Sequence, residues 1–152
     1  MELMTAGVTT REASVDDVTW HILGQTYVPK HRSESSMSWH ATFPHGTFVP
    51  HHVHTTQDEF IYVLTGELEL ELDGGDPVKA GPGDLVRMPQ DVPHGIFNRS
   101  GKDATCLFWV SPTRRLYDLF WALHALGPNA NPADVVAVSA RHEVDFLPPE
   151  EA

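Results

Sequence analysis

The chain has 152 residues, with 21 acidic against 10 basic side chains and a formal net charge of −11. This acidic balance excludes nucleic acid and anionic membrane surfaces as expected partners, because both carry negative charge themselves. The length suits one domain with a sizeable core, and the single cysteine, Cys106, excludes an intrachain disulfide. The sequence has neither a signal-peptide pattern nor an apolar run of membrane-spanning length, so we expect a cytoplasmic protein that does not enter a membrane.

The first part of the chain predicts a loose arm followed by strands. Residues 1–12 are small and polar, which is typical of a terminus that packs poorly. Residues 16–20 predict a short helix or turn. Residues 22–28 and 38–43 predict strands, and the polar segment between them, residues 29–36, predicts a surface loop.

A histidine-rich stretch over residues 46–66 reads GTFVPHHVHTTQDEFIYVLTG and is patterned as strand, turn and strand. Side chains two apart in a strand point to the same face, so His52 and His54 converge while His51 points away. A short polar turn follows, and we expect the chain to return with Glu59 beside the two histidines on an antiparallel neighbouring strand. Imidazole and carboxylate together suit borderline divalent metals.

Residues 67–72 alternate glutamate and leucine without interruption, which predicts a strand with leucines in the core and glutamates in water. A cation site on the three glutamates is a weaker alternative to this solvated face. Residues 73–76, Asp-Gly-Gly-Asp, predict a hairpin turn with positive φ. The segment over residues 83–98 then supplies His94 as the candidate third histidine.

The last third of the chain changes to helical spacing. Residues 113–126 carry one apolar stripe, which consists of Leu116, Leu119, Phe120, Leu123 and Leu126. Gly127 and Pro128 predict the end of this helix. A second helix is predicted from Asn131, its cap, to about residue 140. Such a pair must bury its stripe, and the barrel mouth and a partner subunit are the available surfaces.

Two segments resemble the two sequence motifs of the cupin superfamily, and together they cover about a third of the chain. The first motif is matched in spacing by Gly46, His52, His54, Glu59 and Gly66. The second is matched by Gly83, Pro89, Asp91, His94 and Asn98. Asp91 is a departure, since the family usually has glycine there. Aspartate tolerates the left-handed conformation better than most residues, so we expect the turn to survive.

The resemblance implies an all-β cupin fold, a double-stranded β-helix or jelly-roll barrel with a C-terminal pair of short helices. We expect a single cupin domain over residues 1–152, with the barrel core at about 38–111 and the helical extension at about 113–142. The resemblance also implies one divalent transition metal (Fe, Ni, Mn, Cu or Zn) as cofactor. Its ligands would be His52, His54, Glu59 and His94. Four protein ligands leave one or two open positions, which distinguishes catalytic from structural sites. The alternative is that these are barrel-interior residues and no metal binds.

Strand parity also predicts which side chains line a substrate pocket beside the metal. The predicted residues are Phe48, Pro50, Ile61, Val63, Ile96 and Asn98. An apolar pocket with a few polar groups suits a small aromatic ligand. For Ile61, Val63 and Ile96, simple filling of the barrel is an equally good interpretation. His45 and His51 are interpreted as surface residues or as supports of the ligands.

The C-terminal segment, with Tyr117 to Phe120 in it, is more loosely similar to that of quercetin-dioxygenase-like single-domain cupins. A divalent metal binds an enol oxygen and lowers its pKa, and Glu59 is the predicted general base. The resemblance implies a dioxygenase for a flavonol-like, phenolic or enolisable dicarbonyl small molecule. The alternatives are a non-redox isomerase, cyclase or decarboxylase, and a non-catalytic binding module. Exposed sheet edges predict a homodimer.

Overall fold

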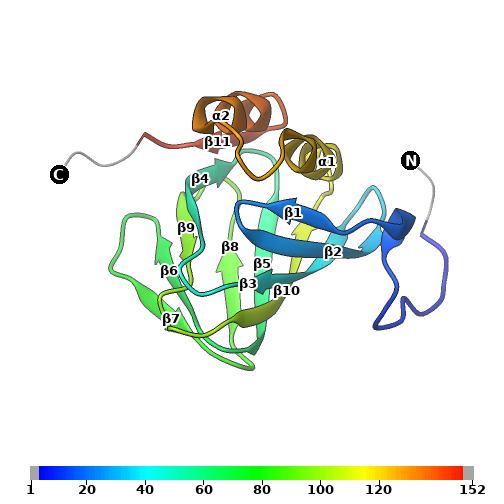
Figure 1. The fold of residues 1–152 in the computed structure, drawn as a ribbon, viewed down its shortest axis with the longest axis horizontal. Coiled ribbons are helices and arrows are strands. Elements are labelled where there is room, and N and C mark those ends of the chain that lie inside the picture. The colour runs from blue at the N-terminus through cyan, green and yellow to red at the C-terminus, as the bar shows by residue number, and fades with distance from the viewer. Residues whose placement is uncertain (1–3, 149–152) are drawn as a thin grey trace.

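Two antiparallel sheets face each other and form a barrel. Figure 1 shows this fold in a computed structural model that describes residues 4–148. The strands are β1 (Trp20–Ile22), β2 (Gln25–Arg32), β3 (Met37–Phe43), β4 (Phe48–His54), β5 (Asp58–Thr65), β6 (Leu68–Leu72), β7 (Val78–Ala80), β8 (Leu85–Met88), β9 (His94–Phe97), β10 (Ala104–Ser111) and β11 (Val144–Phe146). The first sheet has the order β1-β2-β3-β10-β5-β8, and the second has the order β11-β4-β9-β6-β7. The expected all-β barrel is confirmed.

The described part of the N-terminal arm, residues 4–12, is exposed throughout, and its last residues are hydrogen-bonded to β2. Residues 4–12 contain no helix or strand, while residues 1–3 lie outside the described part of the chain. The Nζ atom of Lys30 donates to the backbone oxygens of the arm, at 3.2, 3.1 and 2.8 Å from those of Thr10, Arg11 and Ala13. One lysine of β2 therefore satisfies several backbone carbonyls at the end of this segment.

The next two predicted boundaries were wrong. A turn at Leu23 and Gly24, with φ of 53° and 84°, divides the predicted strand over 22–28 into β1 and β2. Strand β2 then continues to Arg32, so the first half of the predicted surface loop is strand instead. The reason is pairing with β3, which extends to the pair Arg32 and Met37. Hydrogen bonding to a neighbouring strand overrides the polar composition of this segment.

The turn predictions at 73–76 and at Asp91 are confirmed. Asp73 and Gly74 have φ of 52° and 72°, and Asp91 has φ of 65°, so aspartate adopts the left-handed conformation in place of glycine. Gly66 is required by close approach as well as by its φ of 77°, because a Cβ there would lie 2.6 Å from the backbone oxygen of Asp103. The first cupin-like motif therefore ends in a turn that requires glycine, and the second contains a turn that aspartate can adopt.

The core between the sheets is rich in aromatic rings. Trp39, Phe43 and Phe108 stack on one another, with centroid distances of 5.3 Å and 5.8 Å to Phe108. Cys106 is fully buried in the same strand as Phe108. Burial raises the pKa of this thiol to about 12, so it remains a neutral core side chain as expected.

Two helices and the last strand cover one end of the barrel (Figure 1). Helix α1 spans Leu116–Leu126 and ends at Gly127, and helix α2 spans Pro132–Ala140. Asn131 caps α2 as predicted, because its side chain accepts from the backbone nitrogen of Ala133. Strand β11 was not predicted, since three residues carry too little pattern, and it pairs with β4. Within residues 4–148, no helix is long and apolar enough to cross a membrane.

Candidate metal centre

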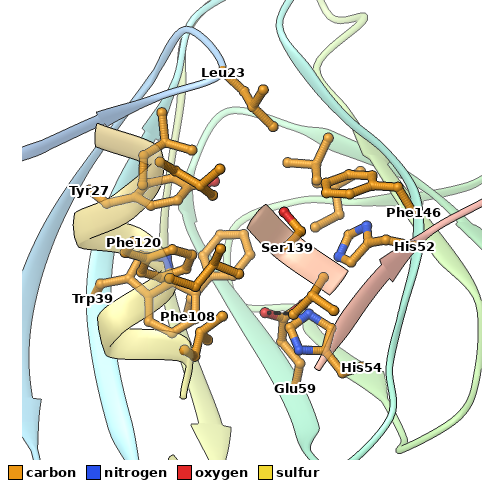
Figure 2. Close-up of a pocket in the computed structure, with 17 residues that line it drawn as sticks. Leu23, Tyr27, Trp39, His52, His54, Glu59, Phe108, Phe120, Ser139 and Phe146 are labelled. Atoms are coloured by element: carbon orange, nitrogen blue, oxygen red, sulfur yellow. Dashed lines mark ion pairs between the residues drawn. The ribbon is translucent and has the colours of Figure 1, made fainter. Parts of the chain in front are cut away.

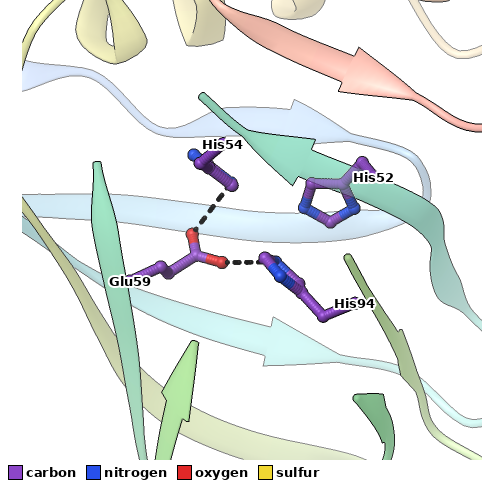
Figure 3. Close-up of side chains that lie close together, drawn as sticks. All are labelled: His52, His54, Glu59 and His94. Carbon is purple, nitrogen blue, oxygen red and sulfur yellow. Dashed lines mark hydrogen bonds and ion pairs between the residues drawn. The ribbon is translucent and has the colours of Figure 1, made fainter. Parts of the chain in front are cut away.

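Four buried side chains form one cluster between the two sheets. His52 and His54 extend from β4, His94 from β9 and Glu59 from β5 (Figure 3). One donor atom from each of them lies within 4.8 Å of all the others. Metal–nitrogen and metal–oxygen bonds of about 2.0 to 2.2 Å allow donor atoms up to about 4.4 Å apart, so small shifts of about 0.5 Å or less close the cluster on one ion.

The cluster spans both sheets, which corrects the expectation that Glu59 lies on a strand next to the histidines. His52 and His94 are direct partners in the second sheet. Glu59 lies in the first sheet, where its neighbours are Met88 and Val110. The polar turn after β4 crosses from one sheet to the other. Three imidazoles from one sheet therefore face a single carboxylate from the other.

Backbone oxygens orient two of the imidazoles. The Nδ1 atom of His52 lies 2.7 Å from the backbone oxygen of Pro50, and that of His94 lies 3.1 Å from the oxygen of Val92. A carbonyl oxygen can only accept, so each Nδ1 carries the hydrogen. In the neutral ring, Nε2 then carries a lone pair, and this tautomer is the one that ligates a metal through Nε2.

The third imidazole is oriented by Gln57, a residue that sequence reasoning missed. The Nδ1 atom of His54 lies 2.8 Å from Oε1 of Gln57. The orientation of this amide is fixed, because its Nε2 donates to the backbone oxygens of Pro112 and Thr113 at 3.0 and 2.7 Å. Gln57 is 3% exposed. Its only sequence signal was its place in the turn between the ligands, which it shares with two threonines.

The electrostatics of the cluster favour a cation. Burial raises the pKa of Glu59, but the nearby His54, His94 and His52 outweigh it and lower this pKa from 4.5 to about 2. Burial, together with His94 and His54, lowers the pKa of His52 well below 6.5. A carboxylate and an uncharged imidazole therefore share the site at neutral pH.

The contacts to Glu59 point to the same conclusion. Its oxygens lie 3.2 Å from Nε2 of His94 and 3.6 Å from Nε2 of His54. With the hydrogens on Nδ1, these are contacts between lone pairs and an anion. A proton on one Nε2 would satisfy one contact, whereas a divalent cation would satisfy all of them. The donor set thus fits a single divalent metal ion.

An inner cavity of about 50 Å³ adjoins the cluster. We use the term aromatic wall for Tyr27, Trp39, Phe108 and Phe120, which line the cavity on the side away from the histidines (Figure 2). Helix α2 contributes Ser139 to the same lining. The cavity is therefore mostly apolar, with its polar groups at a few points.

A larger apolar groove of about 840 Å³ lies outside the inner cavity, between the β1–β2 turn and helix α2. We call it the outer groove. Four side chains line both spaces and so separate them: Ile22, Leu23, Leu123 and Phe146. The inner cavity and the outer groove therefore share these four side chains as a common boundary.

Phe48 and Pro50 do not line the inner cavity, which corrects their prediction. Both are exposed, and Phe48 stacks on Phe97 on the outside of the barrel. Strand β4 contains a bulge: three steps from Val49 to His52 oppose two steps on β9. The extra residue inverts the parity, so Val49 faces inward with His52. Pro50 lines the outer groove instead.

Of the other four predicted pocket residues, one lines the inner cavity and three do not. Ile96 lines the inner cavity. Ile61 and Val63 are fully buried but are not part of the lining, which agrees with the alternative that they fill the barrel. Asn98 is buried, and its Nδ2 donates to the backbone oxygens of Phe43 and Lys102, both at 2.7 Å. Asn98 therefore stabilises a turn that lies away from the cavity.

His45 and His51 lie outside the cluster, as expected. His45 is exposed, and its Nδ1 accepts from the backbone nitrogen of Gly101. His51 pairs with Glu71 at 3.0 Å on the outer face of the second sheet. Arg99 also contacts Glu71 and Glu69 there, so the alternating glutamates form a surface ion-pair group, in agreement with the solvated-face interpretation.

Most of the cavity lining was not predicted from sequence. Tyr27 comes from β2, Phe120 from α1, Ser139 from α2 and Phe146 from β11. These elements lie outside the two motifs, and no local pattern indicates that their side chains meet. The one available signal was the apolar stripe of α1, for which the barrel mouth was a candidate surface.

Comparison with known proteins gives matches to the same central region. Residues 39–110 match the family described as "Cupin domain". The chain is 35% identical over 68 residues to the polyketide synthase CurC of Streptomyces cyaneus (44% of this chain, 43% of that protein). It is 33% identical over 75 residues to the protein SchB of Streptomyces halstedii (49% and 53%), and 36% identical over 62 residues to the dimethylsulfoniopropionate lyase DddQ of Ruegeria pomeroyi (41% and 30%). The chain thus spans about half or less of the length of these curated relatives.

Solved structures match over a larger part of the chain. KdgF from Halomonas sp. superposes with a TM-score of 0.64 at 23% identity, over 74% of this chain and 99% of that one. An RmlC-like cupin from Shewanella frigidimarina gives 0.64 at 20% identity, over 74% and 96%. At these identities the likeness concerns the fold alone. Both motifs, residues 46–66 and 83–98, lie within the matched residues 39–110, so the central part of this chain is similar to the cupin family in sequence and its barrel is similar in fold.

Proposed function

We propose that the chain is a metal-dependent enzyme that acts on a small enolisable or phenolic molecule. The observation that carries this proposal is the orientation of the three imidazoles, each of which has Nδ1 on an acceptor, while Nε2 of His54 and of His94 lies beside Glu59. This arrangement is costly without a cation and is the usual support of a metal site. A bound divalent ion would supply Lewis-acid polarisation of a substrate oxygen.

Glu59 is the proposed proton acceptor. It is buried beside His54 and His94, and its pKa of about 2 keeps it ionised at neutral pH. So low a pKa makes the carboxylate a weak base. It accepts a proton readily only from a hydroxyl whose own pKa is lowered, which is the condition that binding to a cation creates.

The two spaces limit the substrate. Pockets for drug-sized ligands measure about 300 to 1,000 Å³, whereas the inner cavity measures about 50 Å³. Only the reacting end of a flavonol-sized molecule fits beside the cluster, and its body would occupy the outer groove once Phe146 and Leu23 move apart. The apolar and aromatic lining suits an aromatic or aliphatic body.

For the reaction class, we propose dioxygenation of a flavonol-like, phenolic or dicarbonyl substrate. A non-redox reaction, such as isomerisation, cyclisation or decarboxylation, is the second candidate. It is favoured by the names of two relatives, a polyketide synthase and a lyase, neither of which is named as an oxygenase. Both reaction classes use the same Lewis-acid site.

Oxygen uptake tests this proposal. The protein is loaded in turn with Fe, Ni, Mn, Cu and Zn and is supplied with a flavonol, a catechol or a 1,3-diketone. Oxygen consumption with a redox metal supports dioxygenation. Substrate loss without oxygen, with zinc as well, supports the non-redox reaction. The His94→Ala variant serves as the control, and failure of every loaded sample to bind or convert any substrate would contradict the proposed function.

A further inference from the structure

Ser139 carries a buried hydroxyl that has no partner within the described residues. The side chain is fully buried, and its Oγ makes no hydrogen bond. It belongs to helix α2, which is outside the matched region of residues 39–110. Figure 2 shows the Ser139 hydroxyl directed into the inner cavity, between the aromatic wall and His52.

A buried hydroxyl without a partner is unfavourable, because it has given up its hydrogen bonds to water. The residues around it in α2 are alanine and valine, so an alanine at this position would suit the helix better. The hydroxyl has no capping role either, since Asn131 caps the helix. A ligand with a polar atom in the inner cavity would give this hydroxyl a partner.

A second polar group lies on the opposite side of the cavity. The hydroxyl of Tyr27 donates to Oε1 of Gln25 at 3.1 Å. Nε2 of this amide donates to the backbone oxygens of Leu23 and Phe48 at 3.0 and 3.4 Å, which fixes its orientation. The Tyr27 oxygen consequently retains its lone pairs as acceptors, so both Ser139 and Tyr27 carry a polar group with unused hydrogen-bonding capacity in the lining of the cavity.

We propose that Ser139 is a substrate-binding residue, which hydrogen-bonds a second oxygen of a ligand whose first oxygen lies at the metal centre. This inference rests on the proposed function and narrows its substrate class. The reacting end must carry two nearby oxygens, as in a hydroxyketone or the enol of a 1,3-dicarbonyl. A hydroxyl on the same end would find an acceptor in Tyr27.

Calorimetric titration with acetylacetone tests the proposal. The protein is loaded with zinc, which is redox-inert, so binding is measured without turnover. Ser139→Ala is expected to weaken acetylacetone binding about 3- to 10-fold, the loss of one hydrogen bond to a ligand. Ser139→Cys keeps the size of the side chain but bonds weakly, so it is expected to behave like alanine. Ser35→Ala, an exposed serine, is the matched control and is expected to bind as the wild type does.

Two further measurements separate this role from a structural one and from the metal site. Zinc content is expected to be unchanged in both Ser139 variants, and the Tm of the ligand-free protein is expected to be unchanged or higher in Ser139→Ala. Equal acetylacetone affinity in wild type and Ser139→Ala, a lowered Tm, or no acetylacetone binding to the zinc-loaded wild type would each overturn the proposal. A wild type that holds no zinc instead overturns the proposed function, which the metal content alone reveals.

Discussion

The motif-bearing strands and the flanking segments contribute different things to one cavity. Residues 39–110 supply every side chain of the candidate metal centre, from β4, β5 and β9. The flanks supply most of the cover, from β1, β2, α1, α2 and β11. The cluster that could hold a metal thus comes from short local motifs, whereas most of the cover of the cavity comes from segments far apart along the chain. Variants on either side test this division, and the largest effect is expected from the ligands themselves.

His94→Ala is expected to lower metal affinity more than about 100-fold, because loss of a ligand exceeds the effect of losing its support. His45→Ala, on the surface, is the control. Competition with a chelator followed by elemental analysis measures both. Near-complete loading of His94→Ala would show that the ligands are assigned wrongly.

Acid is expected to remove the metal only below about pH 6.5. Protons compete with the metal for imidazole nitrogen, and the pKa of His52 is lowered well below 6.5, so this ring stays neutral through that pH. Glu59, with a pKa of about 2, stays ionised throughout. Metal content after dialysis at stepwise lower pH measures the midpoint. Release at a pH above the ordinary histidine range would contradict the assignment of His52.

Gln57→Ala removes the acceptor of His54 without removing a ligand. Metal affinity is expected to fall about 10- to 100-fold, the usual effect of losing such a support. Gln90→Ala, an exposed glutamine, is the matched control. The same chelator competition applies. An unchanged affinity would mean that Gln57 serves only the backbone of Pro112 and Thr113.

Phe146→Ala tests the flanks, with the smallest expected effect. Removal of this ring joins the inner cavity to the outer groove, so affinity for a flavonol is expected to rise several-fold relative to acetylacetone. Leu147→Ala, which lines only the outer groove, is the control. Calorimetry with both ligands on the zinc-loaded protein gives the ratio. A flavonol preference equal in both variants would place the restriction elsewhere.

The same division explains how much could be predicted from sequence. Strand parity and motif spacing identified His52, His54, Glu59 and His94, because these depend on neighbours along the chain. Parity tells which face a residue occupies but not which sheet its strand joins, so the strand of Glu59 was wrongly expected to pair with the strand of His52 and His54. Helix α2 and its cap were predicted for the same local reason.

The wrong predictions have a common cause: they concern contacts between residues far apart along the chain. Phe48 and Pro50 were misplaced because the bulge in β4 depends on its pairing with β9, which no single strand reveals. The aromatic wall and Ser139 were missed because they meet only after the sheets close and the helices cover the barrel. Sequence thus predicted the buried cluster of four side chains well and its surroundings poorly.

The bulge in β4 also bears on how this barrel can be redesigned. Because the bulge lies between Val49 and His52, the Phe48 side chain can change without rotating His52 and His54, whereas Pro50 lies in the bulge and its backbone oxygen orients His52. The start of β4 could therefore be replaced, for example by a longer loop that contacts a different ligand, without disturbing the histidines. Deletion of one bulge residue would do the reverse: it would couple both halves again and turn Val49 out of the barrel.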